Sequence, residues 1–156
     1  MIAIAFNNFL GALAQFMGAA ADLKFAVLPR QLWVNQAVET EGAAAGSDPN
    51  CGDPYSIFRQ YDGDIEQIGV DTIRVQCETT ASSNDAGMAQ AGALRNTLLD
   101  ANGRPLRMTA IPAFSGGPAY RINAARPRAP GLVRRDERGR GVVVFNVELE
   151  IVALAS

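Results

Sequence analysis

Histidine is absent from this chain of 156 residues, and lysine occurs once, at Lys24. Without histidine the chain lacks Ser-His and Cys-His catalytic pairs, and it lacks the ligand that most zinc sites use. The phosphate loop GxxxxGK is also absent, and no serine stands at the Ser-x-x-Lys spacing before Lys24. We therefore expect no enzyme activity, no catalytic residues and no bound cofactor.

Cysteine is scarce as well, with Cys51 and Cys77 alone and far apart in the sequence. They form no CxxC pair, so neither a zinc motif nor a redox motif is indicated. We expect both thiols to be reduced, as in a protein that is assembled in a cytosol.

A basic segment is missing from the N-terminus, where a signal peptide would need one. The first 21 residues are apolar, but no Lys or Arg precedes Lys24, and Asn7, Asn8 and Gln15 interrupt the apolar run. The larger apolar side chains instead recur at the spacing of an amphipathic helix, which predicts a core helix here and no membrane association. They are Phe6, Phe9, Leu10, Leu13, Phe16 and Met17, followed by Ala20.

Extended and helical patterns alternate along the rest of the chain. Val70 to Glu78 alternates apolar and polar residues, which is typical of a half-buried strand. Ser83 or Asn84 is expected to cap a helix that runs to about Asp100. Further extended segments are expected at residues 25–34 around Pro29, at 108–114, at 120–123 and at 142–154, and a long exposed loop at 39–56.

This order of elements favours an α+β fold. We expect an antiparallel β-sheet of about four strands covered by two α-helices, in a single domain with long loops that spans residues 1–156. Apolar residues make up 48% of the chain, which is enough to build one core of this size.

Acidic and basic residues are separated along the sequence. Residues 36–85 contain ten acidic residues and two arginines, whereas residues 95–140 contain ten arginines and three acidic residues. Such a separation suits contacts between identical copies, in which the basic patch of one copy meets the acidic patch of the next. Alternatively, the two sets interleave in the folded subunit and neutralise each other.

Asp62, Asp64 and Glu66 offer the only lead toward metal chemistry. In an extended segment their carboxylates would share a face and could hold Mg²⁺ or Ca²⁺, as in a metal-dependent nuclease. Gly63 makes the segment turn-like and acidic loops are usually solvated, so we expect no metal site.

The arginines from Arg121 to Arg140 could bind the phosphates of DNA. Tyr120 is the only aromatic residue nearby on which a base could stack, and the pI of about 5.1 is low for a dedicated nucleic-acid binder. We therefore keep a DNA-binding accessory protein as a lesser alternative.

One segment near the C-terminus carries a recognisable pattern. Residues 130–140 read Pro-Gly-Leu-Val-Arg-Arg-Asp-Glu-Arg-Gly-Arg and precede a strand that contains Asn146. This resembles the C-terminal signature of phage minor capsid and tail terminator (tail completion) proteins, in which Pro-x-Leu leads to Arg-Asp-x-x-Gly-Arg and then to a strand with Asn. The preceding order of a helix, a Trp-Val strand, an alternating strand and an Ala-rich helix is also similar.

The resemblance implies a structural virion protein that forms a hexameric ring, terminates the tail tube and joins it to the head connector. Its partners would be the tail tube protein and the connector or stopper protein, and DNA would pass through the lumen without specific binding. It would be assembled in the host cytoplasm and lie at the head-tail interface of the virion. Another head-tail joining protein or a tail tube protein is the alternative.

Two groups of residues receive roles under this resemblance. An arginine-rich segment would contact a neighbouring subunit or the adjoining ring, and acidic residues could line the lumen so that DNA slides without sticking. The first group is Arg126, Arg128, Arg134, Arg135, Asp136, Arg138 and Arg140, and the second is Asp62, Asp64 and Glu66.

Overall fold

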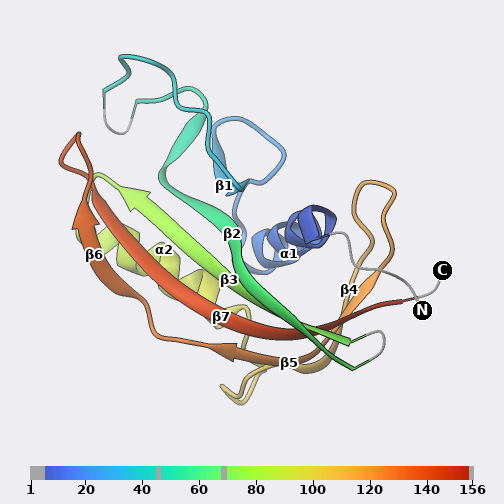
Figure 1. Cartoon of the computed structure of the whole chain (residues 1–156). Coiled ribbons are helices and arrows are strands. Elements are labelled where there is room, and N and C mark those ends of the chain that lie inside the picture. Colours follow the sequence, from blue (N-terminus) through green and yellow to red (C-terminus); the bar gives the residue numbers. More distant parts are fainter. Residues whose placement is uncertain (1–5, 45–46, 68–69, 155–156) are drawn as a thin grey trace.

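The computed structural model of the chain describes residues 6–44, 47–67 and 70–154, with the backbone alone described for residues 62–67 and 70. Its main feature is a seven-stranded mixed sheet curled into a half-barrel, accompanied by two helices (Figure 1). In chain order the elements are α1 (Phe6–Ala21), β1 (Arg30–Val34), β2 (Cys51–Gln67), β3 (Val70–Ala81), α2 (Asn84–Asn96), β4 (Arg107–Ile111), β5 (Tyr120–Pro127), β6 (Gly131–Arg135) and β7 (Gly141–Ala153).

Three long strands form the centre of the sheet, whose order is β1-β2-β3-β7-β5-β4. β3 and β7 pair without a register shift from Val70 opposite Val152 to Ala81 opposite Gly141. β5 and β6 follow each other along the far side of β7, so that each covers one part of that long strand. The prediction of a long C-terminal strand at 142–154 is confirmed, with its bounds shifted by one residue at each end.

The expected antiparallel sheet of about four strands covered by two helices is wrong. The start of β2, at residues 51–56, was expected to belong to a loop because it is rich in Gly, Pro and Asp. Pairing with β3 from Tyr55 onward, and with β1 at Cys51, overrides this weak local preference. The sheet is mixed because the connection at residues 35–50 crosses back to the start of β2, so that β1 and β2 run parallel.

Both predicted helices are present, and each has a defined end. α1 ends with Asp22 at φ +57°, and the amide of Leu23 donates to Gly18 O at 2.8 Å, a left-handed C-terminal cap. The side chain of Ser83 accepts from the amide of Ala86 at the start of α2, as predicted. α2 ends at Asn96 rather than near Asp100, because the backbone tightens into turns after it.

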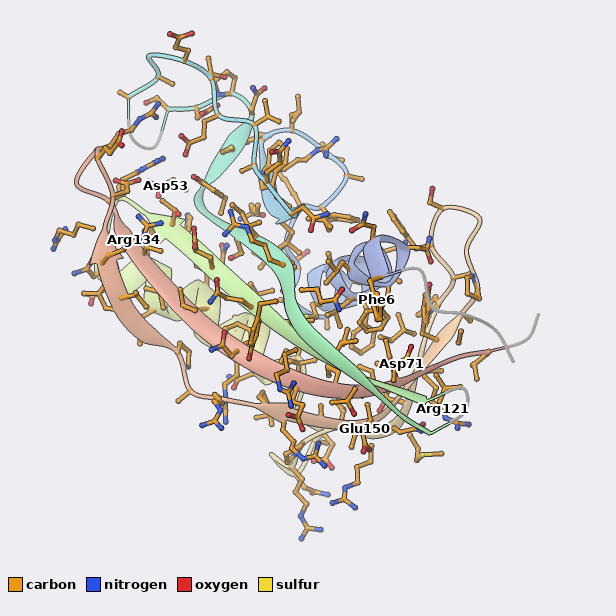
Figure 2. The ribbon with its side chains drawn as sticks, viewed as in Figure 1. Phe6, Asp53, Asp71, Arg121, Arg134 and Glu150 are labelled. Atoms are coloured by element: carbon orange, nitrogen blue, oxygen red, sulfur yellow. The ribbon has the colours of Figure 1, made fainter. Side chains whose placement is uncertain are left out.

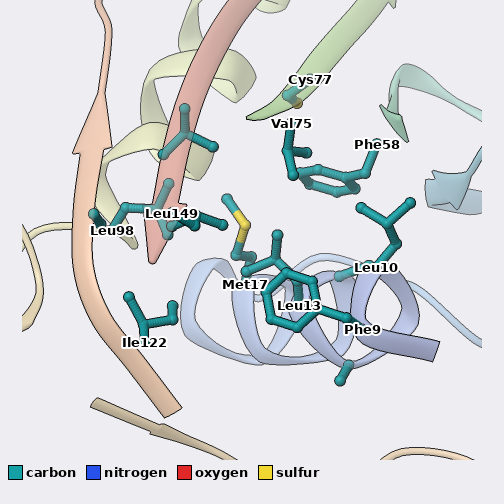
Figure 3. Close-up of a cluster of buried hydrophobic side chains, with 14 of the residues drawn as sticks. Phe9, Leu10, Leu13, Met17, Phe58, Val75, Cys77, Leu98, Ile122 and Leu149 are labelled. Carbon is teal, nitrogen blue, oxygen red and sulfur yellow. The ribbon is translucent and has the colours of Figure 1, made fainter. Parts of the chain in front are cut away.

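The two helices pack against the same face of the sheet. Figure 3 shows the centre of the resulting core, where side chains of α1 meet those of β2, β3, β5 and β7. Phe9 contacts the ring of Tyr120 edge-on at 5.1 Å, and the Tyr120 hydroxyl donates to Asn8 Oδ1 at 2.7 Å. The core members labelled in Figure 3 are Phe9, Leu10, Leu13, Met17, Phe58, Val75, Cys77, Leu98, Ile122 and Leu149.

Candidate functional site

The face of the sheet opposite the helices, called the outer face below, carries most of the paired charges. Odd-numbered residues of β3 and β7 from Ile73 to Cys77 and from Val143 to Ile151 are buried in the core, and even-numbered ones between them are partly exposed. Figure 2 shows the side chains spread along β7 and its neighbours, from Arg134 on β6 to Glu150 near the other end.

Arg140 joins three segments at one end of the outer face. Its Nη2 donates to Glu39 Oε1 at 2.8 Å, and its Nε donates to Asp136 Oδ2 at 2.7 Å. The Tyr55 hydroxyl also donates to Glu39, and the guanidinium carbon of Arg140 lies 5.8 Å from the centre of the Tyr55 ring. These contacts tie the loop at residues 35–50 to the start of β2 and to the β6–β7 turn.

The acid-base properties of this cluster favour stable charges. Burial alone would raise the pKa of Glu39, but hydrogen bonds from Tyr55 and Arg140 outweigh it and hold that pKa below its ordinary value. Burial acts in the same way on Asp136, whose pKa is lowered by hydrogen bonds from Arg140 and Arg138. Burial and the bond to Glu39 raise the pKa of Tyr55. At neutral pH the carboxylates are ionised and the tyrosine is neutral, so none of the three is poised for proton transfer.

The sequence pattern at residues 135–140 has a clear structural role in this cluster. Asp136 Oδ1 accepts hydrogen bonds from the backbone amides of Arg138 at 3.0 Å and Arg140 at 2.8 Å. Gly139 adopts a φ of +75°, a conformation that residues with a side chain rarely adopt. The Asp, Gly and Arg of this pattern therefore build and anchor the tight turn between β6 and β7.

Two further carboxylates on the outer face are each shared by two arginines. Glu78 pairs with Arg59 at 3.2 Å and with Arg134 at 3.7 Å. Glu148 pairs with Arg74 at 3.2 Å and with Arg126 at 2.8 Å. Arg126 and Arg134, from the basic part of the sequence, thus meet carboxylates of β7 and β3 within one subunit.

A cavity of about 480 Å³ lies between the loop at residues 35–50 and the β6–β7 turn. Its walls include Glu39, Glu78, Arg134 and Arg140, all engaged in the ion pairs just described. A ligand that entered it would have to break pairs that already satisfy these groups, and this makes the cavity a poor recognition site.

A second cavity, of about 680 Å³, is more basic. It lies beside β4 and β5 and is lined by Arg104, Arg107 and Arg126 together with Asp100. Asp100 Oδ1 accepts from the backbone amides of Asn102 and Arg104, so this carboxylate holds the turn that precedes β4. Nothing in the sequence groups these residues, because Arg126 comes from a segment separate from residues 100–109.

The structure divides the predicted arginine-rich group. Arg126, Arg134, Arg138 and Arg140 pair with carboxylates of the same subunit, which supports the alternative that opposite charges neutralise each other there. Arg135 donates to the backbone oxygen of Gly139 at 3.0 Å. Arg128, the remaining arginine of the group, is exposed, and so are all residues of β6.

The partner carboxylates were the part that sequence reasoning missed. Glu148 could have been found, because it lies on the polar side of an alternating strand. Glu39 gave no signal, because it lies in a segment expected to be a solvated loop.

The backbone of the predicted acidic group, residues 62–66, belongs to β2 and pairs with β3. The side chains of Asp62, Asp64 and Glu66 lie outside the described residues, so neither their predicted place in a lumen nor a metal site among them is tested. Elsewhere, in the side chains that the structure does describe, no group of three or more Cys, Asp or Glu residues is arranged to hold a metal ion.

Within the described ranges, neither helix is long and apolar enough to cross a membrane. Comparison with known proteins finds no protein family that matches the chain and no characterised protein with a matching sequence.

Proposed function

We propose that the chain is a structural subunit of a phage particle that assembles into a hexameric ring, terminates the tail tube and joins it to the head connector. In this role its partners are the tail tube protein and the connector or stopper protein. DNA passes through the ring without specific binding, and the protein resides at the head-tail interface of the virion after assembly in the host cytoplasm.

The observation that carries the proposal is the structure of the segment that resembles tail terminator proteins. Residues 130–140 contain β6, a strand at an open edge of the sheet, and the tight β6–β7 turn, which Asp136 anchors. Leu132 and Val133 on this strand are 51% and 63% exposed. An exposed strand edge with apolar side chains is a common site of association with another chain.

The pairing of the arginines favours a structural role over DNA binding. Binding to DNA phosphates depends on cations that are free to replace counterions. Four of the arginines in the predicted group are already paired within the subunit, which reduces what they could contribute to such binding.

The direct test is native mass spectrometry of the purified protein at low and high salt, with electron microscopy of the same sample and of tail tubes to which the protein has been added. We expect closed rings of six copies, or subunits that bind at the ends of tubes and stop their growth.

Other outcomes would identify the alternatives. Long tubes formed by the protein itself would identify a tail tube protein, because a tube subunit stacks without limit whereas a terminator closes and stops. A monomer that ignores tubes and binds DNA in a salt-sensitive way would overturn the proposal in favour of a DNA-binding accessory protein.

A further inference from the structure

We infer that neighbouring subunits of the ring join edge to edge, with β6 of one copy pairing with the distal part of β2, residues 61–67, of the next. This inference rests on the proposed ring and adds to it the surfaces that close the ring. It assigns the acidic residues of β2 to the subunit interface, in place of the expected position in the lumen.

The first observation is that β6 and the distal part of β2 each present an open edge, on opposite sides of the β3–β7 pair. Within the described parts of the chain β6 pairs with β7 alone, and all five of its residues are exposed. On the other side β1 pairs with β2 as far as Phe58, and among the described residues no strand pairs with the outer edge of β2 from Tyr61 to Gln67. Figure 1 shows β6 and β2 on either side of β3 and β7. Open strand edges of this kind readily pair with another chain.

The second observation is that the two edges have opposite charge. Residues 128–135 contain three arginines and no acidic residue, whereas residues 61–67 contain three acidic residues and no cation. Arg128 and Arg135 have no carboxylate partner among the described residues of the subunit, so their charge remains available to a neighbour. Opposite charges on facing strands stabilise the pair, and like charges destabilise it.

Apolar residues accompany the charges on both edges. Leu132 and Val133 are exposed on β6, and Tyr61 is 52% exposed where the open part of β2 begins. Ile65 adds a second large apolar residue to this segment of the sequence. A contact between the two edges would remove these residues from water, which adds a hydrophobic contribution to the charge complementarity.

The strand directions also fit. Each neighbouring pair from β2 through β3 and β7 to β6 is antiparallel, so β2 and β6 run in opposite directions. Copies placed side by side with their strands in the same sense would therefore bring these two edges together as an antiparallel pair. The contact joins different surfaces of two copies, which is the kind of contact that closes rings.

The two edges are displaced along the strands. Leu132 lies opposite Val143, which lies opposite Thr79, which in turn lies opposite Ser56. The open part of β2 begins at Tyr61, so successive copies would be staggered by at least five residues, roughly 16 Å at about 3.3 Å per residue. A constant stagger tilts the strands against the ring axis, as closure of a β-sheet into a barrel requires.

Charge reversal on each edge tests the pairing. One variant carries Val133→Glu and Arg135→Glu, which leaves the Arg134–Glu78 pair intact, and the other carries Asp62→Arg and Asp64→Arg. We expect each variant alone to raise the concentration needed for ring formation about tenfold or more, and the combination of all four changes to restore rings. Arg104→Glu with Arg107→Glu is the matched control, since it also places two new glutamates on the surface, away from both edges.

Thermal unfolding followed by circular dichroism shows whether each variant folds. Crosslinking adds an independent measurement, because Cys51 and Cys77 are both buried. Val133→Cys combined in turn with Asp62→Cys, Asp64→Cys or Glu66→Cys should give covalent oligomers on oxidation for at least one pair.

The possible results separate the two proposals. Rings that persist in both folded charge-reversal variants, or single variants that fail and are not restored by the combination, would overturn the edge pairing and leave the ring function standing. A wild-type protein that forms no rings and ignores tube ends would overturn the proposed function itself.

Discussion

Arg140 connects separate segments of the chain, although it lies in a charged, glycine-containing segment of the sequence. Its side chain is 11% exposed and bridges Glu39 and Asp136, which are 26% and 16% exposed. A partly buried cation shared by two carboxylates is costly to remove, because both carboxylates are then left without their partner.

We expect Arg140→Ala to reduce the free energy of unfolding at neutral pH by about 1–3 kcal/mol, measured by urea denaturation. Arg135→Ala, at an exposed position, should change it by about 0.5 kcal/mol or less and serves as the control. Equal effects of the two substitutions would contradict the assigned role of Arg140.

The effect of Arg140→Ala should depend on pH. The pKa values of Glu39 and Asp136 lie below their ordinary values in the folded protein, so the stabilisation from these carboxylates is complete above the ordinary values and is lost as the pH falls through the folded-state values. We expect the difference between wild type and variant to be constant near neutral pH and to shrink as the pH falls below the ordinary pKa of 4.5 for Glu39. A difference that does not change over this acidic range would contradict the ion-pair explanation.

The two cysteines offer a second test at the scale of single residues. Burial raises the pKa of both the Cys51 thiol and the Cys77 thiol to about 12. We expect neither thiol to react with a thiol reagent at pH 8 in the folded protein, and both to react after unfolding in guanidinium. Rapid labelling of the native protein would show that one of the two sites is open to solvent.

At the scale of elements, α1 is positioned by contacts with the segment that connects β4 and β5. Asn8 Nδ2 donates to Phe114 O at 2.7 Å, and the ring of Phe114 lies directly over Gly11. A Cβ atom at Gly11 would overlap the Phe114 ring at Cε1, so glycine is required there by close packing.

Two glycines in helices should therefore respond in opposite ways to the same substitution. Gly11→Ala should lower stability by about 1–3 kcal/mol, because the Phe114 ring must move and its contact with Phe25 is disturbed. Gly92→Ala in α2 meets no atom within 4 Å and should raise stability by about 0.5–1 kcal/mol through helix propensity. Thermal or urea unfolding measures both, and a stabilising Gly11→Ala would contradict the packing described here.

At the scale of the whole molecule, the separation of charge along the sequence becomes an interleaved pattern in space. The fold brings Arg126, Arg134, Arg138 and Arg140 against Glu39, Glu78 and Glu148, and the net charge of the chain is −2. Arg128 and Arg135 are the exceptions in the predicted arginine-rich group, because neither has a carboxylate partner among the described residues.

We expect the protein to bind a fluorescently labelled DNA duplex weakly or not at all at physiological ionic strength, as measured by anisotropy. The reason is that most arginines of the predicted group are paired, and phosphate binding would have to break those pairs. Tight binding that weakens steeply with added salt would contradict this expectation and favour the DNA-binding alternative.

The sequence by itself determined the elements whose signal is local. The apolar spacing from Phe6 onward specified α1, Ser83 specified the start of α2, and strict alternation specified β3 and β7, because helix caps and side-chain periodicity act within a few residues. The pattern Asp-x-x-Gly-Arg carried a resemblance in the sequence, and its role as the anchor of the β6–β7 turn came only from the structure.

Only the tertiary structure decided the rest. β2 is a strand through its pairing with β3, against the preference of its glycine and aspartate residues, and β6 is a strand through its pairing with β7. Of the two partners of Arg140, Glu39 lies 101 residues away in the sequence and Asp136 lies four residues away. The pairing of strands that are distant in the sequence follows no local pattern of residues. The number of strands, the half-barrel and its open edges therefore depend on the tertiary structure.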